Sequence, residues 1–206
     1  LSKDNGEPSY CTATGVLKGI EAAVKYKLNR NNLEGLTVAI QGIGMVGYTL
    51  ATYLHKMGVR LIVSDIKAEN CKKAENELGA KVVSSETIHQ SECDVFSPCA
   101  LGAIINDTTI HELNTPIIAG AANNQLARTY HGNILHEKGI LYATDYVINA
   151  GGLIYASSLY NKTEPKLANE QVNNIYHSLL NIFQRSEEEN IPCSEIADKI
   201  AREKLA

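Results

Sequence analysis

The chain has 206 residues, 44% of them hydrophobic and 20% charged, which suits one large folded domain and excludes a fibrous or disordered protein. The formal charge of −4, from 19 basic and 23 acidic side chains, provides no field that would attract nucleic acid or an anionic membrane surface. No apolar run reaches the roughly 18 residues of a membrane span, and the 5 cysteines form no Cys-x-x-Cys pair, so we expect a cytoplasmic protein with reduced thiols.

Helices and strands are expected to alternate along most of the chain. Apolar side chains recur at helical spacing over residues 12–28. Two short apolar runs, at 37–41 and 60–65, predict buried strands on either side of a helix over 45–57. The same patterns predict a helix at 68–78, strands near Val82 and at 94–96 and 116–119, a helix at 126–138 and a strand at 140–142. Such alternation is typical of a doubly wound α/β fold, in which a mostly parallel sheet carries helices on both faces.

The pattern changes after Gly151-Gly152. From there the sequence predicts long amphipathic helices at 172–185 and 194–204. No internal repeat or low-complexity tract divides the chain. We therefore expect one domain over residues 1–206, with C-terminal helices from about residue 153 that lie outside the sheet or return toward a missing neighbour.

A glycine motif follows the first predicted strand and opens the next predicted helix, and it reads Gly42-Ile43-Gly44-Met45-Val46-Gly47. In this position the first glycine allows a tight turn, the second lets a pyrophosphate approach the backbone, and the third lets the helix pack closely on the strand. The helix N-terminus adds free N–H groups and partial positive charge. The motif predicts a Rossmann-like dinucleotide site, although a glycine-rich turn without a ligand has the same pattern.

Asp65 ends the second predicted strand, at the spacing after Gly47 where an acidic residue accepts hydrogen bonds from the adenosine ribose. Its charge would repel a 2′-phosphate, so the sequence favours NAD over NADP, with Ile66 beside it in the cofactor site. Lys67 and Lys72 lie nearby and could partly accommodate that phosphate. Without the glycines, Asp65 would be an ordinary solvated residue at the end of a strand.

Five blocks stand in order along the chain, at residues 12–16, 41–47, 98–102, 118–126 and 145–152. Together they resemble the C-terminal, nucleotide-binding half of the glutamate/leucine/phenylalanine/valine dehydrogenase family, and the resemblance is nearest to its leucine dehydrogenase type. Ordered blocks over nearly the whole chain are more specific than one glycine motif. The resemblance implies a Rossmann-like α/β domain that binds NAD.

The resemblance also assigns cofactor-binding roles to single residues. Thr12 would hydrogen-bond the nicotinamide carboxamide, and it could also cap the first helix. Asn124 matches the family asparagine beside the nicotinamide, whereas Asn123 stands where many relatives of the leucine type have aspartate. Cys99 is interpreted as a small packing residue rather than a nucleophile, because hydride transfer needs no thiol. The remaining expected cofactor contacts are Ala100, Leu101, Ala122 and Asn149.

The resemblance places a substrate pocket after Gly151-Gly152. Leu153 and Ala156 would form its floor, where the leucine-type enzymes tend to carry valine. Leucine in place of valine narrows a pocket, and alanine in place of valine widens it. A difference of one methylene changes the free energy of discrimination between two substrates by roughly 1–3 kcal/mol. The two effects oppose each other, and Leu153 with the paired asparagines also resembles aromatic amino-acid dehydrogenases. Branched aliphatic substrates, leucine foremost, therefore rank only modestly above phenylalanine or tryptophan. Glutamate ranks last because this floor offers no cation.

Other chemistry has little support in the sequence. The 6 histidines show no spacing typical of metal ligands, so we expect no metal site and surface or capping roles for them. Ser157 and Ser158 lie in no Gly-x-Ser-x-Gly elbow, so the sequence does not predict a hydrolase.

The implied activity is NAD-dependent oxidative deamination of an L-amino acid to its 2-oxo acid and ammonia. The family's catalytic lysines lie in an N-terminal substrate domain with a Gly-Gly-Gly-Lys segment, and that segment does not occur in this sequence. We therefore assign no catalytic residue here and expect that domain as a missing partner, with a homo-oligomer when the protein is full length. A non-catalytic module that senses NAD, and the nucleotide domain of an unrelated dehydrogenase, are the alternatives.

Overall fold

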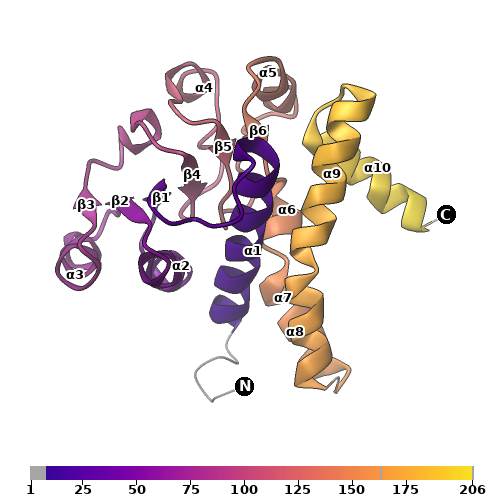
Figure 1. Cartoon of the computed structure of the whole chain (residues 1–206), viewed down its shortest axis with the longest axis horizontal. Helices are drawn as coiled ribbons and strands as arrows, with labels where there is room; N and C mark the ends of the chain where they lie inside the picture. Colours follow the sequence, from indigo (N-terminus) through magenta and orange to yellow (C-terminus); the bar gives the residue numbers. More distant parts are fainter. Residues whose placement is uncertain (1–7, 163, 206) are drawn as a thin grey trace.

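The computed structural model describes residues 8–162 and 164–205, and within them one six-stranded sheet is surrounded by helices (Figure 1). The strands are β1 (Thr37–Gln41), β2 (Arg60–Ser64), β3 (Lys81–Val82), β4 (Val95–Pro98), β5 (Ile117–Ile118) and β6 (Leu141–Tyr142). All pairs are parallel, in the order β3-β2-β1-β4-β5-β6. The strand order therefore reverses beside β1, and open α/β sheets bind ligands at such a point, at the carboxyl ends of the strands.

Helices cover both faces of the sheet and continue beyond it. They are α1 (Pro8–Leu28), α2 (Met45–Lys56), α3 (Ala68–Leu78), η2 (Ile88–Gln90), α4 (Thr109–Glu112), α5 (His131–Glu137), α6 (Asp145–Ile148), α7 (Gly151–Tyr160), α8 (Pro165–Asn173), α9 (Ile175–Glu189) and α10 (Cys193–Leu205). Figure 1 shows α2 and α3 on one side of the sheet and α4 and α5 on the other. α1 packs against α2, α7 and α9, and the C-terminal helices lie outside the sheet.

The alternation of side chains along each strand divides the core between the two faces of the sheet. Val38 and Ile40 belong to an apolar cluster that includes α1, α2 and the C-terminal helices, while Ala39 belongs to the cluster on the other face. Val95 and Phe96 are divided in the same way. Both faces are therefore shielded from water, as is usual for parallel sheets.

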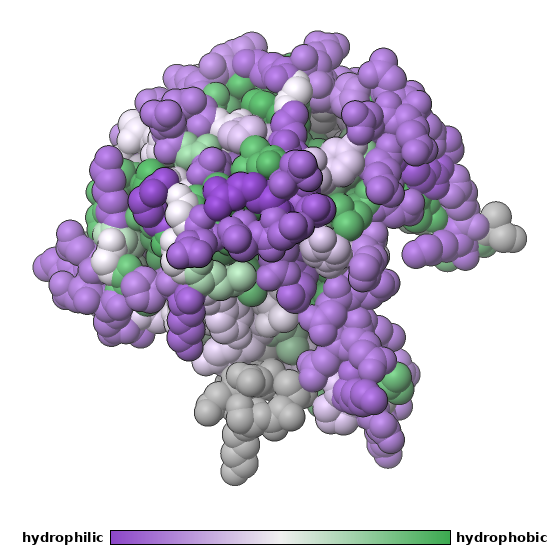
Figure 2. All heavy atoms as spheres, viewed as in Figure 1, coloured by the Kyte–Doolittle hydropathy of each residue, from purple (hydrophilic) through white to green (hydrophobic). Residues whose placement is uncertain are grey.

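The surface seen in Figure 2 is mostly hydrophilic, and hydrophobic side chains occur on it in small separate groups. Apolar side chains scattered in this way are ordinary on a surface in contact with water. Among the described residues, no helix has both the length and the apolar character needed to cross a membrane.

Most predicted elements occur close to their expected positions, and the differences have local causes. The helix predicted at 126–138 begins only at His131, because the backbone at 126–127 pairs with Ile105 instead. The helix predicted at 172–185 is divided between α8 and α9. α7 lies at the start of the C-terminal helical region expected from about residue 153, and its bounds are not predicted because its apolar side chains show no helical period.

Two of the histidines, for which surface or capping roles are expected, are buried, so a surface role is wrong for them. His89 is 4% exposed and His131 is fully buried. The His131 ring accepts a hydrogen bond from the Arg128 N–H at Nδ1 (3.0 Å) and donates from Nε2 to Asp107 (2.9 Å). His131 therefore anchors the start of α5 to the loop that precedes α4.

Replacing Asp107 by asparagine tests this anchor through its pH dependence. Hydrogen bonds from Tyr130 and His131 hold the pKa of the Asp107 carboxyl below its ordinary value. The ionised group therefore stabilises the fold fully above the unfolded-state pKa of about 3.9, and this stabilisation is lost as the pH falls through the lower pKa of the folded state. We expect Asp107→Asn to lower the free energy of unfolding at pH 7, and the difference from the unmodified chain to shrink below about pH 4. Urea denaturation across this range measures both quantities, and a difference independent of pH would contradict the prediction.

Candidate functional site

The turn from β1 into α2 is held by close packing at two of its glycines. Gly42 has a φ of +95°, and a Cβ there would lie 2.7 Å from the Cβ of Ala100. A Cβ at Gly47 would lie 2.0 Å from the carbonyl oxygen of Gly42, so no larger residue allows α2 to pack this closely. Gly44, in contrast, has no atom within 4 Å of the position of a Cβ. Two glycines are thus required by the protein itself, and the one between them leaves room for a ligand.

The N-terminus of α2 supplies hydrogen-bond donors beside this open position. The helix is 12 residues long, its N-cap residue is Gly44, and no side chain caps it. The first N–H groups of a helix have no carbonyl partner within the helix, and they carry partial positive charge. An anion such as a pyrophosphate would find several donors here.

Asp65 lies directly after β2 at the same edge of the sheet, and two backbone N–H groups fix its carboxylate. Oδ2 accepts a hydrogen bond from Ile43 (2.7 Å), and Oδ1 accepts one from Lys67 (2.8 Å). A carboxylate has about four acceptor positions, so lone pairs remain for ribose hydroxyls. Ile66 is 93% exposed beside it. The structure therefore brings the acidic residue and the glycine turn together, as the motif predicts.

A cleft of about 530 Å³ lies next to the glycine turn, beyond the ends of β4 and β5. It is lined by Thr12, Val46, Cys99, Ala100, Ala121, Ala122, Asn123, Tyr146, Asn149, Ala150 and Leu153. Most residues expected around the nicotinamide therefore meet here, from five separate segments of the chain. Leu101, Asn124 and Ala156 are not among the lining residues, and all three are exposed.

Thr12 lies within α1 and not at its start, so the predicted helix-capping role is wrong. α1 begins at Pro8, a residue whose fixed φ suits a first helical turn. The Thr12 hydroxyl donates a hydrogen bond to the Pro8 carbonyl oxygen (2.8 Å). This bond uses the hydroxyl hydrogen and leaves the oxygen able to accept a hydrogen bond from an amide in the cleft.

Cys99 borders the cleft in surroundings that favour packing. Its Sγ lies 3.5 Å from Ser97 Oγ. Burial raises the pKa of the Cys99 thiol, which keeps it protonated near neutral pH. A protonated thiol is a weak nucleophile. These surroundings agree with the interpretation of Cys99 as a packing residue.

The loop after β5 is held by the amide of Asn149. Its Nδ2 donates to the Ala121 carbonyl oxygen (3.1 Å) and to Asn123 Oδ1 (2.6 Å). Asn123 thus acts as an acceptor, which is also the only role that an aspartate could fill at this position. Asn124 has a left-handed backbone with φ of 51°, and its carbonyl oxygen accepts a hydrogen bond from Ala103 (2.7 Å). Asparagine tolerates such a backbone better than most residues.

Tyr146 lines the cleft although it is not among the predicted site residues. Its hydroxyl donates to Asp198 Oδ1 on α10 (2.5 Å), 52 residues later in the chain. Desolvation, together with Asp198, raises the pKa of Tyr146, so the hydroxyl remains a donor. In the sequence, the position of Tyr146 in the 145–152 block could have indicated that it belongs to the site. The wall of the cleft therefore depends on the C-terminal helix.

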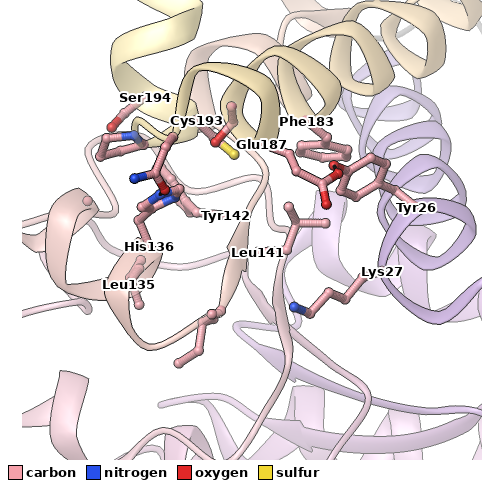
Figure 3. A pocket seen from close by; sticks show the side chains of 16 residues that line it. Tyr26, Lys27, Leu135, His136, Leu141, Tyr142, Phe183, Glu187, Cys193 and Ser194 are labelled. Atoms are coloured by element: carbon pink, nitrogen blue, oxygen red, sulfur yellow. Dashed lines mark hydrogen bonds between the residues drawn. The ribbon is translucent and has the colours of Figure 1, made fainter.

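Another hollow, of about 300 Å³, fits a cofactor less well because it lies where β6 begins, at the opposite edge of the sheet (Figure 3). Figure 3 shows Tyr26 and Glu187 turned toward each other, and the Tyr26 hydroxyl donates a hydrogen bond to Glu187. None of the predicted cofactor or substrate residues lines this hollow. Among the described residues, no group of three or more histidine, cysteine or acidic side chains could hold a metal ion.

Comparisons with known proteins identify the family to which the chain belongs. Residues 63–191 match the model of the Glutamate/Leucine/Phenylalanine/Valine dehydrogenase family. A leucine dehydrogenase from Thermoactinomyces intermedius is 46% identical over 201 residues, which cover 98% of this chain and 55% of that protein. A phenylalanine dehydrogenase from the same organism is 39% identical over 202 residues, which cover 97% of this chain and 55% of that protein.

A solved structure extends the similarity to three dimensions. The crystal structure of L-tryptophan dehydrogenase from Nostoc punctiforme matches with a TM-score of 0.94 and 42% identity, over 96% of this chain and 61% of that one. The chain thus spans little more than half the length of the relatives that it matches. The alternative of an unrelated dehydrogenase is wrong, because the chain belongs to the glutamate/leucine/phenylalanine/valine dehydrogenase family.

Proposed function

We propose that this chain is the cofactor-binding half of an NAD-dependent amino-acid dehydrogenase. The observation that carries the proposal is the meeting of three features at one edge of the sheet: the open position at Gly44, the uncapped N-terminus of α2 and the fixed carboxylate of Asp65. Together they match the three parts of a dinucleotide-binding motif. The named relatives act on amino acids, which supports the proposed reaction class.

We propose that the residues along this edge bind NAD along its whole length. Asp65 would accept hydrogen bonds from the adenosine ribose, and the first N–H groups of α2 would bind the pyrophosphate. Thr12 would accept a hydrogen bond from the carboxamide, with Asn124 near the nicotinamide. Met45 and Leu101 are 60% and 84% exposed along this path. A bound dinucleotide would cover part of this apolar surface.

The chain contributes position and electrostatics to the proposed reaction. When bound, NAD supplies an acceptor for the hydride that leaves the substrate Cα. Asn149 and Asn123 hold the cleft loop in one arrangement, and Cys99 and Ala100 close the cleft from the side of β4. Groups that are fixed before binding lower the entropic barrier to aligning the reacting atoms.

The proposed substrate is a branched aliphatic L-amino acid, with leucine foremost. Leu153 is 75% exposed at the cleft, and Ala156 is exposed one turn further along α7. Both side chains are therefore available to a substrate held by another domain. We propose that an N-terminal substrate domain supplies the catalytic lysines and completes this pocket, in a full-length homo-oligomer.

An aromatic amino acid is the second candidate substrate. The chain is 42% identical to an L-tryptophan dehydrogenase and 39% identical to a phenylalanine dehydrogenase, which supports this candidate. Alanine at 156 leaves room for about two more carbon atoms than valine would, and an aromatic ring could use that room.

The cofactor preference is tested with Asp65→Ala in the 206-residue chain. We expect the unmodified chain to bind NAD more tightly than NADP. The substitution should narrow the difference, because it removes both the ribose acceptor and the charge that repels a 2′-phosphate. A hydrogen bond to a charged group contributes about 1.5–3 kcal/mol, so NAD affinity should fall by roughly 10-fold or more. Isothermal titration calorimetry with both cofactors measures these affinities.

Asp94→Ala is the matched control for this experiment. Asp94 Oδ2 also accepts a backbone hydrogen bond, from Thr37 (2.7 Å), but at the opposite edge of the sheet. Its replacement should leave the ratio of NAD to NADP affinity unchanged. Equal affinity of the unmodified chain for the two cofactors would contradict the assignment of NAD.

The need for a second domain is tested by activity. We expect the 206-residue chain alone to reduce no measurable NAD with any amino acid, and fusion to its upstream domain to restore turnover. Positioning and general-base catalysis together supply many orders of magnitude in rate, and both require the substrate domain. Calorimetry on the same sample would show that NAD still binds. Clear activity of the isolated chain would place the catalytic base within it.

Substrate choice is tested with Ala156→Val in the full-length enzyme. We expect kcat/KM to be highest for leucine, lower for phenylalanine and tryptophan, and lowest for glutamate. The substitution should reduce the values for the aromatic substrates most, by roughly 10- to 200-fold per displaced methylene. Ser157→Thr adds a methyl group at the neighbouring exposed position and should leave the ranking unchanged. An aromatic preference that collapses in Ala156→Val would overturn the leucine ranking, and a glutamate preference would overturn the pocket assignment.

A further inference from the structure

Gln125 is a fully buried polar residue directly after the two asparagines of the cleft loop, and its side chain holds that loop. Its Nε2 donates to the carbonyl oxygens of Gly120 (2.8 Å) and Ala122 (2.9 Å). Its backbone N–H donates to Asp145 Oδ2 (3.1 Å). One residue therefore ties the loop at 120–124 to the start of α6.

The direction of these bonds indicates what the side chain contributes. An amide nitrogen carries two hydrogens, and Gln125 uses both on the loop. The reversed amide would place Oε1 against two carbonyl oxygens, so the bonds determine the orientation. In this orientation Oε1 is buried without a hydrogen-bond partner among the described residues. Leaving Oε1 buried without a partner costs free energy. The two hydrogen bonds that Nε2 donates to the loop outweigh this cost.

The cleft loop is also fixed from two other directions. The Ala122 N–H donates to the carbonyl oxygen of Pro98 at the end of β4 (2.9 Å). Asn149 holds Asn123 from the side of the cleft (2.6 Å). Gln125 provides a third attachment of this loop, from the interior of the protein. A loop held in this way presents its groups to a ligand without first having to become ordered.

We propose that Gln125 is a positioning residue for the nicotinamide end of the cofactor. This inference rests on the proposed function and names a further residue for the same site. Gln125 would not touch the cofactor but would act through Asn123 and Asn124, which belong to the loop that it holds. The adenosine and pyrophosphate would be bound by other segments, at Asp65 and Gly44. Loss of the Gln125 amide should therefore affect one end of the cofactor only.

The test compares NAD with ADP, which contains the adenosine and both phosphates but lacks the nicotinamide riboside. Both ligands are titrated calorimetrically into the unmodified 206-residue chain and into Gln125→Met, which keeps the side-chain length and removes the amide. We expect Gln125→Met to weaken NAD binding roughly 10-fold and to change ADP binding by less than about twofold. Thermal unfolding of each protein detects any general loss of structure.

Thr115→Val is the matched control. Thr115 is also buried, and its hydroxyl donates to the Ile117 carbonyl oxygen (2.9 Å) at the other end of β5. This variant should lose stability without changing the ratio of NAD to ADP affinity. If Gln125→Met does not fold, Gln125→Asn replaces it with the same expectations, because its amide is one methylene too short to reach both carbonyls.

The outcomes separate this inference from the proposed function. A ratio of NAD to ADP affinity that is the same in the Gln125 variant and in the unmodified chain overturns the positioning role. It leaves the cofactor site itself intact, because both ligands still bind. An unmodified chain that binds neither ligand overturns the proposed function, and this inference with it.

Discussion

The close approach of α2 to the end of β1 is the constraint on which the rest of the site depends. The position of a Cβ at Gly47 lies 2.0 Å from the Gly42 carbonyl oxygen, and that of Gly42 lies 2.7 Å from the Ala100 Cβ. These two contacts join the glycine turn to the helix that follows it and to the loop after β4. Asp65 adds the end of β2 through its hydrogen bond to Ile43 (2.7 Å). Three neighbouring strands are therefore connected at one edge by contacts that leave little freedom.

Features governed by neighbouring residues could be predicted from the sequence. The strand at Thr37–Gln41 and the helix at Ala68–Leu78 occur where the sequence predicts them, because the spacing of their apolar residues depends only on their own geometry. The turn at 42–47 could be predicted from its glycine spacing: Gly42 and Gly47 are required by close packing, and Gly44 leaves room for a ligand. The glycine turn and Asp65 do meet at one edge, and most of the residues predicted around the nicotinamide line one cleft.

Features that depend on distant partners could not be predicted in this way. Tyr146 belongs to the cleft wall, and its partner is Asp198, 52 residues further on. The burial of His131 likewise requires Asp107, which precedes it by 24 residues. The apolar side chains of α7 do not gather on one face and show no helical period, so its boundaries appear only when the packing is known. No property of these residues alone indicates which partner they will have.

The place of α1 against the C-terminal helices has a consequence for how the protein is made. Buried residues run along α1 from Cys11 to Val24, and α7 and α9, which pack against this helix, begin more than 120 residues after its end. During translation, α1 leaves the ribosome long before α7 and α9 have been synthesised. Contacts between segments distant along the chain form late and leave apolar surface exposed in the meantime. The nascent chain must therefore keep the apolar face of α1 from associating with other molecules until translation has passed α9.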